Sequence, residues 1–231
     1  MEEVKNETKQ TKTKVFNVII LDKSGSMESI RQAAVDGFNE TLAGIKKAQE
    51  KYAESQEHFV SLLTFCDCEK KYVFDKVPVA EARKLTLGDY EPCCCTPLYD
   101  AMGFTLTTMR NHVKKVDDAV VVVTIITDGY ENASRKFSRE QIRSMVTCHQ
   151  ERDNWDFLFL GADMDAISVA ESYGIHPDRA VSTISDSQSV EMAYGAVIHA
   201  NMYERSSSPS APRTAAWKQD VEQDTKSRSR Q

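Results

Sequence analysis

Hydrophobic residues follow two patterns along the chain: short runs rich in β-branched residues, and longer stretches with a helical period. The short runs predict strands near residues 15–22, 58–66, 70–77, 119–127, 155–161 and 179–183. The periodic stretches predict helices near residues 28–51, 97–115, 138–151, 163–173 and 186–204. Strands and helices mostly alternate, which is typical of a parallel sheet covered by helices.

Two of the predicted strands follow each other without a helix between them, in the segment from Phe59 to Phe74. Only the short polar stretch 66–70 separates them, so the second strand must turn back as an antiparallel edge. We expect the other strands to run parallel, joined by right-handed crossovers. The predicted fold class is therefore α/β: a doubly wound, mostly parallel six-stranded sheet with one antiparallel edge strand and helices on both faces.

The two ends of the chain differ in composition from its middle. Residues 1–14 are polar and aperiodic, and residues 205–231 begin with a stretch rich in Ser and Pro, so we expect both to be disordered tails. A chain of 231 residues can bury one sizeable core, which we place in a single domain over residues 15–204. Trp217 is expected to be exposed to solvent in the second tail.

Charge and hydropathy exclude two classes of partner. The net charge is −6, and Lys and Arg are dispersed along the chain, so no basic surface for nucleic acid is expected. No run approaches the roughly twenty apolar residues that a membrane span requires, and the first fourteen residues do not resemble a signal peptide. We therefore expect a cytoplasmic protein that binds neither nucleic acid nor membrane.

Side chains with oxygen atoms stand at the end of the first predicted strand and directly after it. Asp22 is the last residue of this strand, and Ser24 and Ser26 alternate with other residues before the next predicted helix. One carboxylate and two hydroxyls suit a hard cation such as Mg²⁺, which binds oxygen at about 2.0–2.1 Å. The same residue types are also common N-caps, which bind free backbone N–H groups where a helix begins. This segment alone is therefore compatible with a metal site and with a helix cap.

Two distant segments add oxygen donors at predicted turns. Thr96 and Pro97 stand where a helix is predicted to begin, with Thr as the cap and Pro at the first helical position. Asp128 follows the strongest strand pattern of the chain, residues 119–127. Ligands of doubly wound sheets bind at the carboxyl ends of the strands, where the winding direction reverses. Asp22 and Asp128 both follow strands, which makes them candidates for one crevice.

Together the three segments form the pattern Asp-x-Ser-x-Ser, then Thr, then Asp, and the chain thereby resembles the von Willebrand factor type A (VWA) family over about residues 15–203. The resemblance implies that the first and fourth strands are neighbours and that a metal-ion-dependent adhesion site (MIDAS) binds Mg²⁺, with Mn²⁺ or Ca²⁺ as alternatives. The metal ligands that it implies are Asp22, Ser24, Ser26, Thr96 and Asp128. Residues 96–101 and 155–163 resemble stand-alone intracellular bacterial and phage members of this family.

The implied ligands leave a coordination position for another molecule. If Asp128 acts through water, as the resemblance implies, a partner's Asp or Glu can replace a water of Mg²⁺. We therefore expect a protein-binding module that is not an enzyme. One alternative is an ion that only ties the three loops together. The other, least favoured, is Mg²⁺-dependent phosphoryl hydrolysis, where the general acid would stand at Ser24, and Ser cannot deliver a proton at neutral pH.

The chain contains six cysteines, and no two have the Cys-x-x-Cys spacing of a zinc knuckle, so free thiols are the plain interpretation. Residues 93–95 are three consecutive cysteines directly before Thr96, where the VWA family usually has small, Gly-rich residues. Cys tolerates positive φ less well than Gly, so the conformation of this loop is in question. Cys66 and Cys68 can approach the loop if the predicted hairpin lies at the same sheet end, and redox or soft-metal modulation is then a hypothesis.

Overall fold

The computed structural model describes residues 12–184, 186–199 and 215–228. Its centre is a six-stranded sheet with the order β3-β2-β1-β4-β5-β6. The strands are β1 (Thr13–Asp22), β2 (Gln56–Phe65), β3 (Lys70–Pro78), β4 (Ala119–Thr127), β5 (Asp156–Ala162) and β6 (Ala180–Thr183). Neighbouring strands are parallel except β2 and β3, which are antiparallel. The predicted fold class and the antiparallel edge strand are confirmed.

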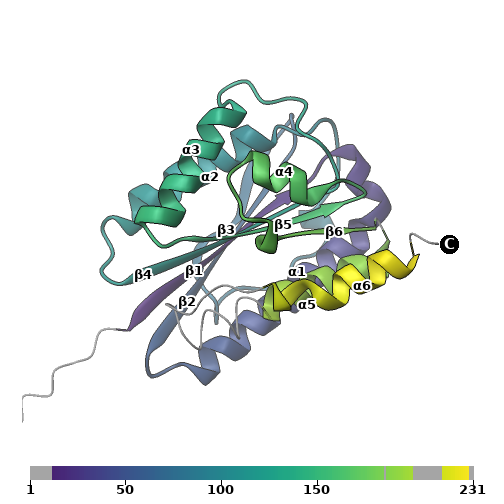
Figure 1. The fold of residues 1–231 in the computed structure, drawn as a ribbon. Coiled ribbons are helices and arrows are strands. Elements are labelled where there is room, and N and C mark those ends of the chain that lie inside the picture. The colour runs from purple at the N-terminus through teal and green to yellow at the C-terminus, as the bar shows by residue number, and fades with distance from the viewer. Residues whose placement is uncertain (1–11, 185, 200–214, 229–231) are drawn as a thin grey trace, which may run out of the picture.

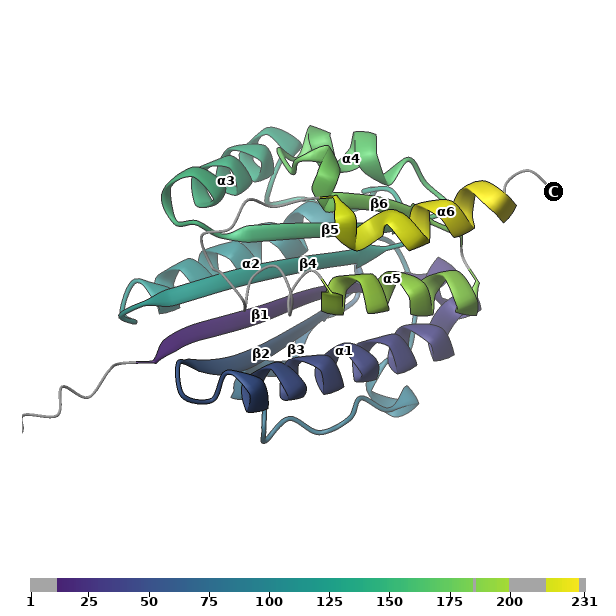
Figure 2. The same ribbon diagram turned by 60° about the horizontal axis from the view of Figure 1, so that its bottom comes forward.

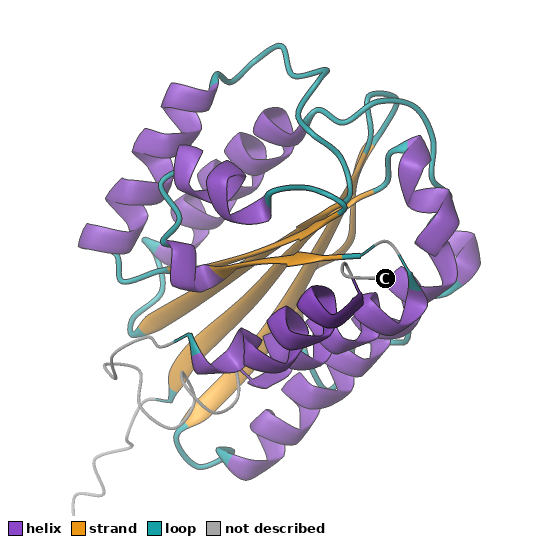
Figure 3. Cartoon of the chain, turned by 45° about the vertical axis from the view of Figure 1, so that its right-hand side comes forward, coloured by secondary structure: helices purple, strands orange, loops and turns teal. Residues whose placement is uncertain are grey.

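Helices cover both faces of the sheet (Figures 1 and 2). One face carries α2 (Leu98–Val113), α3 (Arg139–Arg152) and α4 (Ala166–Ser172). The other carries α1 (Arg31–Lys51), α5 (Ser187–His199) and α6 (Gln219–Arg228). The short 3₁₀ helices are η1 (Gly25–Ile30), η2 (Leu87–Asp89), η3 (Pro177–Arg179) and η5 (Ala216–Lys218). Figure 3 shows the resulting three layers, and no described helix is long and apolar enough to span a bilayer.

Strand β1 shows why the hydrophobic pattern predicts this architecture. Its last eight residues are all buried, since side chains on both faces of the sheet lie under helices. Ile19 and Leu21 belong to the core beneath α1 and α5, whereas Val18 and Ile20 belong to the core beneath α2 and α3. β1 lies between β2 and β4, and the first and fourth strands are thus neighbours, as the resemblance implies. The turn after β1 consequently lies beside the turn after β4.

The C-terminal segment differs from its prediction, because residues 215–228 are helical and packed rather than a disordered tail. Trp217, which we expected to be exposed, has only 3% of its surface exposed, and its indole Nε1 donates to the carbonyl oxygen of Asp178 at 2.8 Å. Lys218 donates to two further carbonyls near β6. The buried apolar residues of this segment are Trp217 and Val221, four apart, and two such residues are too few to produce a recognisable hydrophobic period. The rest of the two predicted tails lies almost entirely outside the described residues.

Candidate functional site

Asp22, at the end of β1, is the most deeply buried of the predicted site residues, with 0% of its surface exposed. One carboxylate oxygen accepts the backbone N–H of Ser24 at 2.7 Å, and the other accepts the hydroxyl of Thr127 at 2.6 Å. The carbonyl oxygen of Asp22 accepts the hydroxyl of Tyr90 at 2.5 Å. The carboxylate is therefore held in one orientation by groups from β4 and from its own turn.

The two serines of the first turn connect Asp22 to the turn after β4. Ser24 Oγ lies 3.3 Å from Ser26 Oγ, and Ser26 Oγ donates to a carboxylate oxygen of Asp128 at 2.6 Å. Ser24 precedes η1 without making a side-chain cap, so its hydroxyl does not act as the N-cap that the sequence left open. The structure thus brings Asp22, Ser24, Ser26 and Asp128 together along one line of contacts.

Gly129 shows that Thr96 belongs to the same site. A Cβ atom at Gly129 would lie 3.1 Å from Thr96 Oγ1 and 3.9 Å from both Asp22 Oδ2 and Ser24 Oγ. Oxygen atoms from the Thr96 loop and from the turn after β1 therefore border one small space beside the turn after β4, and this space is open because residue 129 has no side chain. Thr96 was predicted to be a helix cap, but α2 begins at Leu98 with Pro97 as its N-cap. Its hydroxyl faces the site instead.

Burial dominates the electrostatics of the two carboxylates. It raises the pKa of Asp22 to about 6, although the hydrogen bonds from Thr127 and Ser24 favour the charged form and oppose this shift. Burial also raises the pKa of Asp128, and the negative charge of Asp163 adds to the effect. Among the described residues, neither carboxylate forms an ion pair with Lys, Arg or His; Lys23, inside the motif, pairs with Glu69 at 2.5 Å. A positive charge in this space would be stabilised by both acids.

The loop after Asp128 is fixed by contacts that sequence reasoning missed. Glu131 accepts the backbone N–H groups of Tyr99 and Ser134, and Asn132 exchanges two hydrogen bonds with the backbone of Thr96. Asp100 accepts three successive backbone N–H groups from residues 135–137. These side chains attach the β4 loop to the start of α2, so the distance between Thr96 and Asp128 is set by the fold. Their signal in the sequence is only their proximity to the motif.

Comparisons with known proteins identify the fold. No protein-family model matches the sequence, and no curated protein matches it either. Solved structures do match: proximal thread matrix protein 1 from the mussel byssus, with TM-score 0.58 and 14% identity over 81% of this chain and 46% of that one. The pilus adhesin SpaC from Lactobacillus rhamnosus GG matches with TM-score 0.59 and 13% identity over 84% of this chain and 31% of that one. Manganese-loaded TRAP protein from Plasmodium vivax matches with TM-score 0.51 and 12% identity over 75% of this chain and 68% of that one.

These likenesses establish a VWA-like, Rossmann-like fold. The chain spans less than half of the length of the mussel and pilus proteins that it matches. One structure of the mussel protein has zinc in its MIDAS motif, and the TRAP structure is loaded with manganese. Divalent cations are therefore bound by proteins that share this fold, at identities too low to transfer a ligand set.

Proposed function

We propose that this domain binds a divalent cation, Mg²⁺ in the first place, with Asp22, Ser24, Ser26, Thr96 and Asp128, and that the ion in turn binds an acidic residue of a protein partner. The observation that carries the proposal is the space beside Gly129, where oxygen atoms of Asp22, Ser24 and Thr96 converge, with Asp128 linked to them through Ser26. Neither Asp22 nor Asp128 forms an ion pair with a positive side chain among the described residues. Carboxylate and hydroxyl oxygens are the donors that hard divalent cations prefer. The donor set therefore fits such an ion.

Exposure supports a site that stays open to another molecule. Asp22, Ser24 and Thr96 are buried, whereas Ser26 is exposed and Asp128 is partly exposed. The site is thus closed toward the sheet and open toward solvent, as expected when one coordination position is kept for an external ligand. A bound Mg²⁺ would supply that position, and a carboxylate of the partner is the ligand of matching charge. Tyr130, with 58% of its surface exposed, lies next to the site and offers contact area to a partner.

The same geometry argues against phosphoryl transfer. Ser24 occupies the place where a general acid would stand, and its hydroxyl lies beside that of Ser26. The nearest basic residue in the sequence, Lys23, is paired with Glu69 and does not contribute a phosphate clamp. We therefore propose a binding module rather than an enzyme.

Binding of Mn²⁺, a paramagnetic substitute for Mg²⁺, tests the proposal directly. Wild type should bind one Mn²⁺ per chain at the oxygen site, and Asp22→Ala and Asp128→Ala should each weaken this binding about tenfold or more, since a ligand is lost. Asp36→Ala is the matched control, because Asp36 is an exposed carboxylate on α1 outside the site. Equal Mn²⁺ affinity in wild type and both site variants would refute the ligand set.

The open position is tested on the Mn²⁺-loaded protein. Adding a peptide rich in Glu should displace a Mn²⁺-bound water and lower the relaxation rate of solvent protons, whereas the corresponding Gln peptide should not. Affinity capture in Mg²⁺, in EDTA and with Asp22→Ala then identifies the partner. A relaxation rate that neither peptide changes, with identical capture in all three conditions, would leave the ion a structural role and overturn the recognition step.

A further inference from the structure

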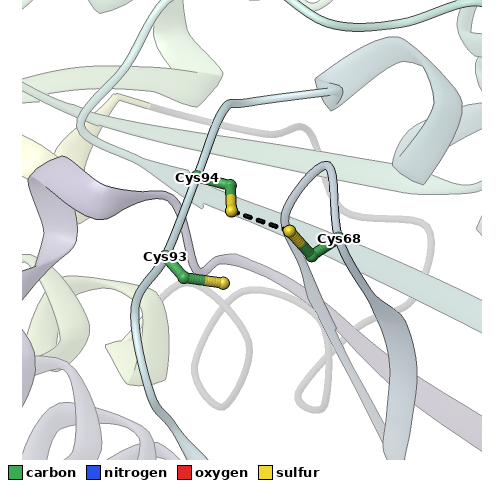
Figure 4. A group of neighbouring side chains, drawn as sticks. All are labelled: Cys68, Cys93 and Cys94. Atoms are coloured by element: carbon green, nitrogen blue, oxygen red, sulfur yellow. Dashed lines mark hydrogen bonds between the residues drawn. The ribbon is translucent and has the colours of Figure 1, made fainter.

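Three cysteine side chains from two loops meet outside the oxygen site (Figure 4). Cys68 lies on the turn between β2 and β3, and Cys93 and Cys94 lie on the loop before α2. The sulfur atoms of all three lie within 4.8 Å of one another, and Cys68 Sγ is 2.7 Å from Cys94 Sγ. A fourth thiol, that of buried Cys66, has its sulfur 3.1 Å from Cys93 Sγ.

We propose that Cys68, Cys93 and Cys94 form a second cation site, a thiolate site for a soft or borderline metal ion such as Zn²⁺, Cu⁺ or Cd²⁺. Thiolates select these ions, whereas Mg²⁺ prefers oxygen. A metal–sulfur bond of about 2.3 Å sets sulfurs about 3.8 Å apart around a tetrahedral ion. The three sulfurs here already lie within 4.8 Å of one another, so small rotations of the side chains would bring them to such an ion. Cys68 and Cys94 are exposed, so an ion can enter from solvent.

A shared centre accounts for the arrangement better than a single disulfide does. A bond between Cys68 and Cys94 would leave Cys93 with only the buried Cys66 as a partner, although the Cys93 sulfur also lies within 4.8 Å of the sulfurs of Cys68 and Cys94. Cys94 also has a φ of 61°, in the left-handed region that disfavours residues with a Cβ atom. Gly would relieve this strain, yet the position carries a thiol directed at two others. The sequence had put the conformation of this loop in question and had placed Cys66 and Cys68 near it only if the hairpin lay at the same sheet end; the structure shows a positive φ at Cys94 and brings Cys68 to Cys93 and Cys94.

The thiolate site would hold the loop that ends at Thr96. The backbone N–H of Cys93 donates to Lys23 O at 2.8 Å, and that of Gly25 donates to Cys94 O at 3.1 Å. The same loop is bound to the hairpin, since Asp67 N–H donates to Cys95 O at 3.0 Å. An ion on Cys68, Cys93 and Cys94 would therefore join the β2–β3 turn to the loop in front of the oxygen site. The oxygen ligands themselves are not part of this second site.

Titration with Cd²⁺ tests the proposal, because cadmium bound to thiolates gives an ultraviolet charge-transfer band. The protein is reduced, kept free of oxygen and saturated with Mg²⁺ so that the oxygen site is filled. Wild type should bind one Cd²⁺ with this band, and Cys68→Ser and Cys94→Gly should each weaken Cd²⁺ binding about tenfold or more. Cys94→Gly is chosen because it removes the ligand while relieving the positive φ, so that the fold is preserved.

Two controls separate this site from the proposed MIDAS and from general thiol binding. Cys95→Ser removes the exposed neighbour that lies outside the three-sulfur group and should leave the band unchanged. Asp22→Ala should also keep it, because the oxygen site uses different ligands. A reduced wild type without the band, or equal losses in Cys95→Ser and Cys94→Gly, would overturn the proposal. So would a band that disappears in Asp22→Ala.

Discussion

Replacement of Asp22 by Asn separates two effects of the buried carboxylate: the stability that it costs the metal-free fold and the metal binding that it supports. The substitution keeps the size of the side chain and removes its charge. The Asn oxygen can still accept from Ser24 N–H, and its amide can donate to Thr127 Oγ1. Thr127 can then direct its hydroxyl to Gly129 O, 3.0 Å away, so that no buried polar group loses its partner.

The expected change in the free energy of unfolding follows from the pKa of Asp22. Its value of about 6 in the metal-free fold lies above the ordinary 3.8, so the folded state binds more protons between these two pH values. The metal-free fold therefore loses stability as the pH rises from about 4 to about 6, by about 3 kcal/mol for a shift of about two units. At neutral pH this cost is fully present. We expect Asp22→Asn to raise the free energy of unfolding of the metal-free protein by about 1–3 kcal/mol.

Urea unfolding near neutral pH, in EDTA and in Mg²⁺, measures both effects. In EDTA the variant should be the more stable protein, which for a chain of this size corresponds to a melting temperature about 2–10 °C higher. In Mg²⁺ at about a hundred times its Kd, wild type should gain about 2.7 kcal/mol, and the variant much less. The reasoning is refuted if the variant is less stable than wild type in EDTA and gains as much from Mg²⁺.

Three further predictions follow from the site and from the C-terminal segment. Gly129→Ala should weaken Mn²⁺ binding about tenfold or more while leaving the melting temperature in EDTA nearly unchanged, because its Cβ would enter the space beside Thr96; calorimetry checks both. Mn²⁺ affinity should fall by up to about tenfold per pH unit below about pH 6 and level off above it, since binding needs the charged form of Asp22; titrations between about pH 5 and 7 test this. Trp217→Ala should cost about 3–5 kcal/mol in urea unfolding, because the indole is buried. It should leave Mn²⁺ affinity unchanged, because the indole binds the carbonyl of Asp178 and none of the proposed ligands.

The fold could be predicted from the sequence because its strands are buried on both faces. Such strands are continuous apolar runs, and their number, their alternation with helices and the single hairpin predicted a six-stranded, mostly parallel sheet. That the first and fourth strands are neighbours was implied by the resemblance to the VWA family and not by the hydrophobic pattern. Helix ends were less certain, since they depend on local contacts: α2 begins at Leu98, because Pro97 has a non-helical ψ of 64°, and Thr96 faces the crevice and does not cap the helix. The docking of residues 215–228 rests on Trp217 and on hydrogen bonds to carbonyls near β6, and a hydrophobic period cannot show it.

The site could be predicted only as a set of residues. The motif supplied Asp22, Ser24, Ser26, Thr96 and Asp128, and the structure brings these side chains together. The groups that orient these side chains could not be predicted. Tyr90 and Asn132 come from segments whose positions depend on the tertiary fold, so no local pattern marks them. Only the tertiary structure shows that they bond the backbone of Asp22 and Thr96.

The oxygen site and the thiolate site share a loop but not their ligands, and this determines how they can influence each other. Hard and soft cations distribute between them by donor type, so that each site can be filled while the other is empty. Their connection is the hydrogen-bonded segment from Cys93 to Thr96, which binds the first turn through Lys23 and Gly25. An ion on the sulfurs would restrict this segment without adding a ligand to the oxygen site. Any effect of this ion on Mg²⁺ affinity would therefore act through the position of Thr96, and removal of the Thr96 hydroxyl should abolish that effect.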